Sequence, residues 1–153
     1  MIKFYSIKKS DYKISKKILN SIKKVISKNN FILGDEVFTF EKLFKEYCGS
    51  KYSISCGNGT DALTISLLSL NLKSGSEVII PAMTYASTFY SILNAKLKPV
   101  LVDINSTDPL INFKEMNKKI TSKTRVIMPV HLYGSVVDLK KLRSVIKKRN
   151  IYI

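Results

Sequence analysis

The first segment that could do chemistry is a glycine-containing turn at residues 56–63, Cys-Gly-Asn-Gly-Thr-Asp-Ala-Leu. It lies between a short apolar run and a helical stretch, so we expect a strand that turns into a helix here. Glycines let the backbone bend tightly and approach a ligand, and the first turn of a helix offers unpaired N–H groups and a positive dipole end. These features can bind a phosphate, to which Thr60 could add a hydroxyl donor.

The same turn also has a purely structural explanation. Asn58 or Thr60 could cap the helix with its side chain, and a cap needs no ligand. The glycine spacing matches neither the dinucleotide-binding fingerprint nor the P-loop. Spacing therefore leaves the phosphate site and the simple helix start equally open.

Two further segments offer an aromatic ring and an imidazole. Residues 81–88, Pro-Ala-Met-Thr-Tyr-Ala-Ser-Thr, surround Tyr85 with small and hydroxylated side chains, which suits a flat ring stacked on an aromatic side chain. Residues 129–134, Pro-Val-His-Leu-Tyr-Gly, contain His131, the only histidine of the chain. Taken alone, Tyr85 is more often a core or rim residue, and His131 is as readily a hydrogen-bonded core residue as a functional one.

The elements that must position these segments alternate regularly from residue 51 onward. Apolar runs are followed by helical stretches, in the order 52–56, 60–72, 77–80, 85–97, 99–102, 112–121, 125–130 and 138–149. This alternation predicts an α/β fold, a mainly parallel sheet flanked by helices. The strand runs are nearly continuous in apolar residues, which indicates that helices cover both faces of the sheet. In such sheets ligands bind beyond the carboxyl ends of the strands, where the three segments are expected.

Two helices are expected before the first strand. Apolar residues at helical spacing, with lysines mostly between them, predict an amphipathic helix over 12–28 that packs on a core, with a membrane-surface helix as the alternative. A second helix is expected over 36–47, with Gly49 as its stop. We therefore expect an N-terminal helical segment at 1–50 and an incomplete α/β domain at 51–153, because the last three residues open a further apolar run.

The formal net charge of +15 raises the possibility of nucleic-acid binding. Against it, 23 of the 26 basic residues are lysines spread along the chain and only 3 are arginines, the better side chain for phosphate and base edges. Two cysteines and one histidine cannot make the usual four-ligand zinc site, so no metal is expected. No apolar run has the length of a signal peptide or a membrane span, which predicts a cytoplasmic protein.

Five motifs in this order resemble the DegT/StrS-like sugar aminotransferase family of fold-type I enzymes, which use pyridoxal 5′-phosphate (PLP). The matching stretches carry glycines, prolines and hydroxylated residues at similar spacing, and they lie at 57–63, 75–81, 84–85, 99–104 and 129–134. Upstream, residues 31–34 and 40–41 also look like the N-terminal segment of the family. The resemblance covers about residues 10–153, and it implies that the chain is the front half of the large domain.

This resemblance implies roles for six residues. Gly59 and Thr60 would hold the PLP phosphate, Asn58 would line the same turn, and Tyr85 would stack on the pyridine ring. His131 would lie near the cofactor pocket, on the substrate side, without an assigned proton transfer. Gly34 would belong to a loop near the sugar-nucleotide site.

The family also implies groups that the chain does not supply. PLP chemistry needs a lysine that binds the cofactor covalently and an acidic partner for the pyridine nitrogen. In the family both follow the strand that opens near Ile151, so no catalytic residue is nominated. The complete protein is expected to be a homodimer that transfers an amino group, from glutamate, to a nucleotide-linked keto-sugar. The alternatives are a PLP-dependent sugar dehydratase of the same family, in which histidine replaces the lysine, and a non-catalytic remnant.

Overall fold

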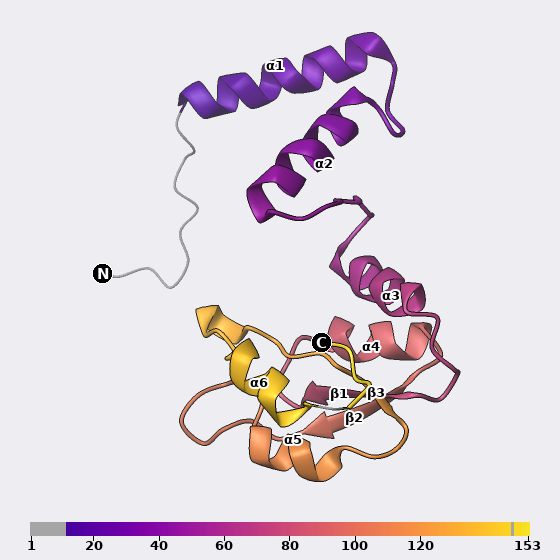
Figure 1. Ribbon diagram of the computed structural model, residues 1–153. Coiled ribbons are helices and arrows are strands. Elements are labelled where there is room, and N and C mark those ends of the chain that lie inside the picture. The colour runs from indigo at the N-terminus through magenta and orange to yellow at the C-terminus, as the bar shows by residue number, and fades with distance from the viewer. Residues whose placement is uncertain (1–11, 148) are drawn as a thin grey trace. The chain divides into compact units, whose positions relative to one another are not determined.

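The computed structural model describes residues 12–147 and 149–153 and divides the chain into two compact units, Met1–Ser55 and Cys56–Ile153, each described by itself (Figure 1). The first unit contains helices α1 (Tyr12–Lys28) and α2 (Asp35–Cys48). Gly49 ends α2 in a left-handed conformation (φ 63°), which lets its N–H and that of Ser50 reach the last carbonyls of the helix. Both expected helices and the glycine stop are confirmed.

The apolar residues of these two helices are not covered within the described chain. Ile14, Ile18, Ile22 and Ile26 repeat every four residues along α1, and each side chain is about half exposed. No described residue of α2 is buried. A short ionic link connects the two helices, because Lys28 Nζ lies 3.2 Å from Asp35 Oδ2 and 3.4 Å from Glu36 Oε1.

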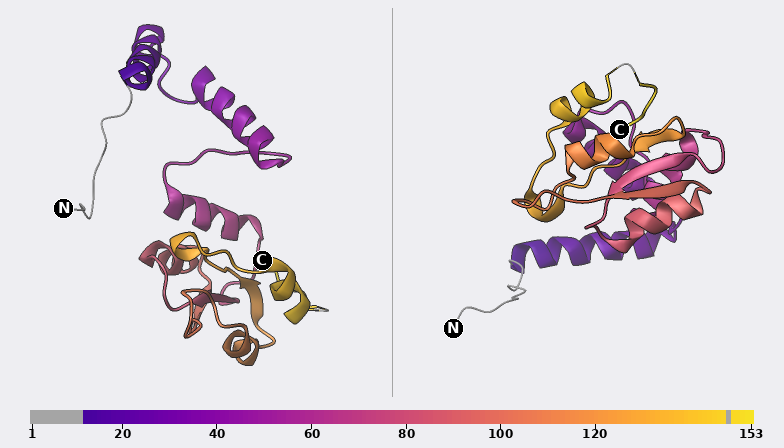
Figure 2. Two further views of the ribbon diagram at one scale, coloured as in Figure 1. Left: turned by 90° about the vertical axis from the view of Figure 1, so that its left-hand side faces the viewer. Right: turned by 90° about the horizontal axis from the view of Figure 1, so that it is seen from below.

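The second unit is built on three parallel strands. In chain order it contains α3 (Gly59–Ser69), β1 (Glu77–Pro81), α4 (Ala86–Asn94), β2 (Lys98–Val102), α5 (Phe113–Lys119), β3 (Thr124–Ile127), a short 3-10 turn η1 (Leu132–Gly134) and α6 (Leu139–Val145). The strand order is β2-β1-β3, and both pairings are parallel. Figure 2 shows helices on the two sides of this sheet. The expected α/β class, a parallel sheet flanked by helices, is confirmed.

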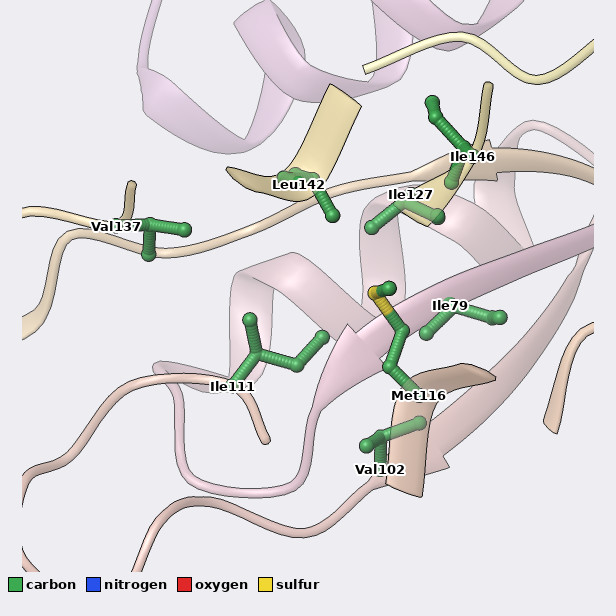
Figure 3. Packing of buried hydrophobic residues seen from close by; sticks show 8 residues of the cluster. All are labelled: Ile79, Val102, Ile111, Met116, Ile127, Val137, Leu142 and Ile146. Atoms are coloured by element: carbon green, nitrogen blue, oxygen red, sulfur yellow. The ribbon is translucent and has the colours of Figure 1, made fainter. Parts of the chain in front are cut away.

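The central strand β1 is buried along its whole length because helices cover both of its faces. Side chains of a strand alternate between faces. Ile79 packs with Met116 of α5 and Leu142 of α6 in one cluster (Figure 3). Val78 and Ile80 point to the other face and pack with residues of α3 and α4. Each such side chain contributes about 1.5–3 kcal/mol through removal of its surface from water.

The end of the chain lies along the free edge of β3. Tyr152 pairs with Val126 in parallel: its N–H donates to the Arg125 carbonyl (2.8 Å), and its carbonyl accepts from the Ile127 N–H (2.9 Å). The apolar run at 151–153 therefore has the position and the direction of a further parallel strand.

The strand expected at 52–56 is not present. This stretch has no regular structure, and Tyr52 and Ile54 are 71% and 85% exposed. A strand is stabilised by the backbone ladder to a neighbour. Here the N–H of Ser55 donates to a carboxylate oxygen of Glu41 (2.7 Å) instead, and the segment is not one of the three paired strands of the described sheet. An apolar run that has no partner strand does not form a strand itself.

Candidate functional site

The turn at 56–59 positions the start of α3, and Asn58 caps this helix. The Asn58 side chain accepts from the Asp61 N–H (2.9 Å) and donates to the Asp61 carboxylate (2.9 Å). Its carbonyl accepts from the Ala62 N–H. Both polar atoms of the Asn58 side chain are therefore used by the helix itself. This is the capping arrangement that the sequence left open, and it leaves the neighbouring residues free for another role.

Gly59 and Thr60 present unpaired donors at the same helix start. Within the described residues, neither backbone N–H has an acceptor, and the Thr60 hydroxyl forms no hydrogen bond. A Cβ atom added at Gly59 would meet nothing within 4 Å, so the space in front of these groups is open. Asp61 would repel an anion, but its carboxylate is turned toward the Asn58 amide. The arrangement can bind a phosphate through two N–H groups and one hydroxyl.

Tyr85 precedes α4, the helix that packs against α3. Its backbone is extended (φ −67°, ψ 141°), the residue is 79% exposed, and its hydroxyl has no partner in the described chain. The hydroxyls of Thr84 and Thr88 bond to each other across the first turn of α4 (2.9 Å). Tyr85 is thus a surface aromatic at the end of β1, and its open face can stack on a planar ring.

His131 lies just beyond β3, at the carboxyl end of the sheet. Its Nδ1 accepts a hydrogen bond from the Val137 N–H (3.0 Å). It also lines a cavity of about 530 Å³, together with Leu63 and Leu67 of α3, Met128 and Tyr152. The cavity lies between the second half of α3 and the segment after β3. A larger cavity of about 730 Å³, between α5 and α6, contains none of the six expected site residues.

Gly34 is a buried residue of the first unit, immediately before α2. A Cβ atom here would lie 2.8 Å from the Asn30 carbonyl oxygen, so only glycine fits. The structure thus gives this glycine a local packing reason. Its expected place near a sugar-nucleotide site remains a prediction.

Sequence reasoning passed over Tyr133, which is 81% exposed and adopts a left-handed backbone (φ 52°, ψ 31°) between His131 and Val137. The signal was an aromatic residue directly before Gly134 in a loop at a strand end.

The described residues contain no cluster of His, Cys, Asp and Glu that could hold a metal ion, and both cysteines are free and exposed. In this same part of the chain, no helix combines the length and the apolar character that a membrane crossing needs.

The chain's similarity to known proteins fits this site. The family model described as "DegT/DnrJ/EryC1/StrS aminotransferase family" matches residues 12–153. The chain belongs to the DegT/DnrJ/EryC1/StrS aminotransferase family. One member, dTDP-3-amino-3,6-dideoxy-alpha-D-galactopyranose transaminase of Aneurinibacillus thermoaerophilus, is 38% identical over 157 residues, which cover 100% of this chain and 42% of that protein.

Solved structures of PLP enzymes show the same fold. NtdA from Bacillus subtilis, with bound cofactor PMP (pyridoxamine phosphate), superposes with a TM-score of 0.87 at 33% identity, covering 92% of this chain and 32% of that one. The E. coli GDP-4-keto-6-deoxy-D-mannose-3-dehydratase, with bound hydrated PLP, has a TM-score of 0.86 at 25% identity, covering 99% and 40%. The fold is therefore that of the front half of the large domain of fold-type I PLP transferases. The chain spans about 42% of the length of the first relative.

Proposed function

We propose that this chain forms the cofactor-phosphate and ring-stacking part of a PLP-dependent sugar aminotransferase. The observation that carries the proposal is the start of α3, where Gly59 and Thr60 offer two unpaired N–H groups and a free hydroxyl to open space. A dianionic phosphate ester matches these donors in charge and in number. Membership in the DegT/DnrJ/EryC1/StrS family supports PLP as the molecule that carries the phosphate.

The chain's own residues would bind and orient the cofactor. Gly59 and Thr60 bind the phosphate, while the Asn58 cap stabilises the first turn of α3. Tyr85 covers one face of the pyridine ring. Bound PLP supplies an electron sink for amino transfer. No residue of this chain is proposed as the covalent lysine or as the acidic partner of the pyridine nitrogen.

In the whole protein, the substrates would be glutamate as amino donor and a nucleotide-linked keto-sugar as acceptor, with Gly34 and His131 on the substrate side. The name of the Aneurinibacillus relative, a transaminase of a dTDP-linked sugar, supports this substrate class. We also propose a cytoplasmic homodimer, as the family resemblance implies, that serves amino-sugar and polysaccharide biosynthesis.

Pyridoxamine phosphate is the sharpest probe of the site, because it binds without a covalent bond to lysine. Thr60→Ala and Gly59→Ala should each weaken its binding to the chain by about tenfold, since each removes a donor or fills the space in front of one. Titration calorimetry measures this affinity. Neither change should harm folding, because the Thr60 hydroxyl has no partner among the described residues and alanine is the better helix residue at position 59.

The urea midpoint of each variant is the control, and it should equal or exceed that of the unchanged chain. Equal affinity of all three proteins for pyridoxamine phosphate, or no binding by any of them, would contradict the proposed cofactor site.

A PLP-dependent sugar dehydratase is the second candidate function. The resemblance in fold to the E. coli 3-dehydratase supports it. The two functions differ at the position of the covalent lysine, which is histidine in the dehydratase reading. Both use the same phosphate site, so the pyridoxamine phosphate titration tests what they share. A non-catalytic remnant would bind the probe without turnover.

A further inference from the structure

The loop between β3 and α6 is closed by one hydrogen bond from the backbone to an imidazole. The N–H of Val137 donates to His131 Nδ1 at 3.0 Å. Val137 is 2% exposed and belongs to the main hydrophobic cluster, so its N–H has no access to water. If the imidazole could not accept, a buried donor would be left unpaired, which is costly. His131 therefore ties the loop 131–137 to the core.

This hydrogen bond also decides the tautomer of the imidazole. A nitrogen that accepts carries no proton, so in the neutral ring the proton is on Nε2. Nε2 of the neutral ring is then an N–H donor, and Nδ1 has a structural task.

The loop is held in a conformation that its sequence does not favour. Tyr133 (φ 52°) and Gly134 (φ 81°) are both left-handed, and the Ser135 N–H closes the turn onto the Leu132 carbonyl (3.0 Å). Glycine adopts this conformation freely, whereas it is sterically unfavourable for tyrosine. Within the described chain Tyr133 is 81% exposed and its hydroxyl has no partner, so no contact there offsets this unfavourable conformation. Among the described residues, positive φ angles also occur at Asn29, Leu33, Asn71 and Lys96, and Tyr133 is the aromatic residue of this set. A strained, exposed aromatic residue that follows a strand is a candidate for a functional role.

The position of the loop at the edge of the sheet indicates that this function is ligand binding. It follows β3, and the segment with Tyr85 follows β1, the strand beside it. Parallel neighbours end at the same edge of a sheet, where ligands of α/β proteins bind. A tyrosine at this edge suits a sugar ring or a nucleobase, because its face stacks and its hydroxyl bonds to oxygen or nitrogen.

We propose that residues 131–137 form a preformed recognition loop for the nucleotide-linked sugar, in which Tyr133 contacts the substrate and His131 is the positioning residue. This rests on the proposed function for the identity of the substrate. The closure of the loop and the placement of Tyr133 rest on the geometry alone.

His131→Asn and His131→Gln form a matched pair that tests the positioning role. The Asn side-chain oxygen occupies the place of Nδ1 and can still accept from Val137, whereas the Gln amide reaches only to the place of Nε2. Amide hydrogen exchange at Val137 should be unchanged in the first variant and at least about tenfold faster in the second. Because the chain has a single histidine, ¹⁵N-histidine labelling gives one pair of ring signals, with Nδ1 expected in the unprotonated range. A protonated Nδ1 in the neutral ring, or equal exchange in both variants, would overturn this role.

Tyr133→Gly tests the recognition role. It removes the strain, so the urea midpoint should be equal or higher, and a clearly lower midpoint would mean that Tyr133 is structural. Its affinity for dTDP-glucose, measured by ligand-detected NMR, should fall about tenfold, and His131→Gln should lower this affinity more than His131→Asn does, because only asparagine keeps the acceptor that closes the loop.

Titration with pyridoxamine phosphate separates this inference from the proposed function. Equal binding of dTDP-glucose by the parent chain and Tyr133→Gly, or no binding by either, would overturn the loop's recognition role even if pyridoxamine phosphate binds. Loss of pyridoxamine phosphate binding with dTDP-glucose binding intact would overturn only the cofactor site.

Discussion

The hydroxyl of Thr121 donates to the carboxylate of Glu77, 44 residues earlier in the chain. Glu77 is the first residue of β1 and only 5% exposed. Its carboxylate also accepts from Thr124, the first residue of β3, and from Lys98, the first residue of β2 (3.2 Å). One buried carboxylate thus joins the starts of all three strands, at the edge of the sheet away from the candidate site.

Glu77→Gln should lower the free energy of unfolding by about 1–3 kcal/mol. The glutamine amide keeps the shape of the side chain but lacks the negative charge of the buried carboxylate, which accepts hydrogen bonds from three donors. Urea unfolding followed by circular dichroism measures the change. Glu46→Gln is the control and should change stability by less than about 0.5 kcal/mol, because Glu46 is exposed and its side chain has no partner among the residues that the structure describes. Equal effects of the two changes would rule out this role of Glu77.

The same carboxylate should make stability depend on acid. The hydrogen bond from Thr121 holds the pKa of Glu77 below its ordinary value of 4.5, against the opposing effect of burial and with help from Lys98. A carboxylate whose pKa is lowered by folding stabilises the fold fully at pH values above its ordinary pKa. This contribution is lost as the pH falls through the pKa of the folded state. The urea midpoint should therefore drop below about pH 4.5 more steeply in the parent chain than in Glu77→Gln. Parallel profiles would contradict the linkage.

Ile79→Ala should lower the free energy of unfolding by about 2–5 kcal/mol, because the Ile79 side chain on β1 is fully buried against the helices α5 and α6. Ile54→Ala provides a matched control, since Ile54 is 85% exposed and lies in the segment that forms no strand. It should change the free energy of unfolding by less than about 0.5 kcal/mol. A large cost at Ile54 would show that residues 52–56 pack as a strand after all.

Asn58→Ala should destabilise the start of α3 by about 1 kcal/mol, whereas Asn58→Ser should cost less because its hydroxyl oxygen can still accept from the Asp61 N–H. Chemical denaturation of both variants checks this difference. If Asn58 also contacted the phosphate, its side chain could not remain on Asp61. Pyridoxamine phosphate affinity should therefore follow helix stability in this pair, and a loss of affinity at unchanged stability would assign Asn58 a direct contact.

Gly34→Ala should destabilise the start of α2, since the added Cβ would lie 2.8 Å from a backbone oxygen that cannot move freely. A fall in helical circular dichroism at moderate temperature is the expected sign. Gly59→Ala serves as the comparison because the same atom meets nothing there. If both changes were tolerated, the close packing at Gly34 would be wrong.

Much of the second unit could be read from local pattern. The buried strand expected at 77–80 and the alternation of strand and helix follow from apolar spacing, which acts over a few residues, as does the glycine stop of α2 in the first unit. The expected strand at 52–56 failed because an apolar run has no strand partner of its own. Strand formation depends on a neighbour that the local sequence does not name.

The candidate site divides in the same way. Sequence alone determined that a glycine turn, Tyr85 and His131 follow apolar runs of an α/β chain, because residue type and spacing are local properties. Only the tertiary structure decided that the Asn58 side chain caps α3 and that the donors of Gly59 and Thr60 stay unpaired among the described residues. It also decided that the Val137 N–H donates a hydrogen bond to His131. Each of these depends on which polar groups meet in space once the core has formed, and hydrogen-bond partners are chosen by that geometry rather than by composition.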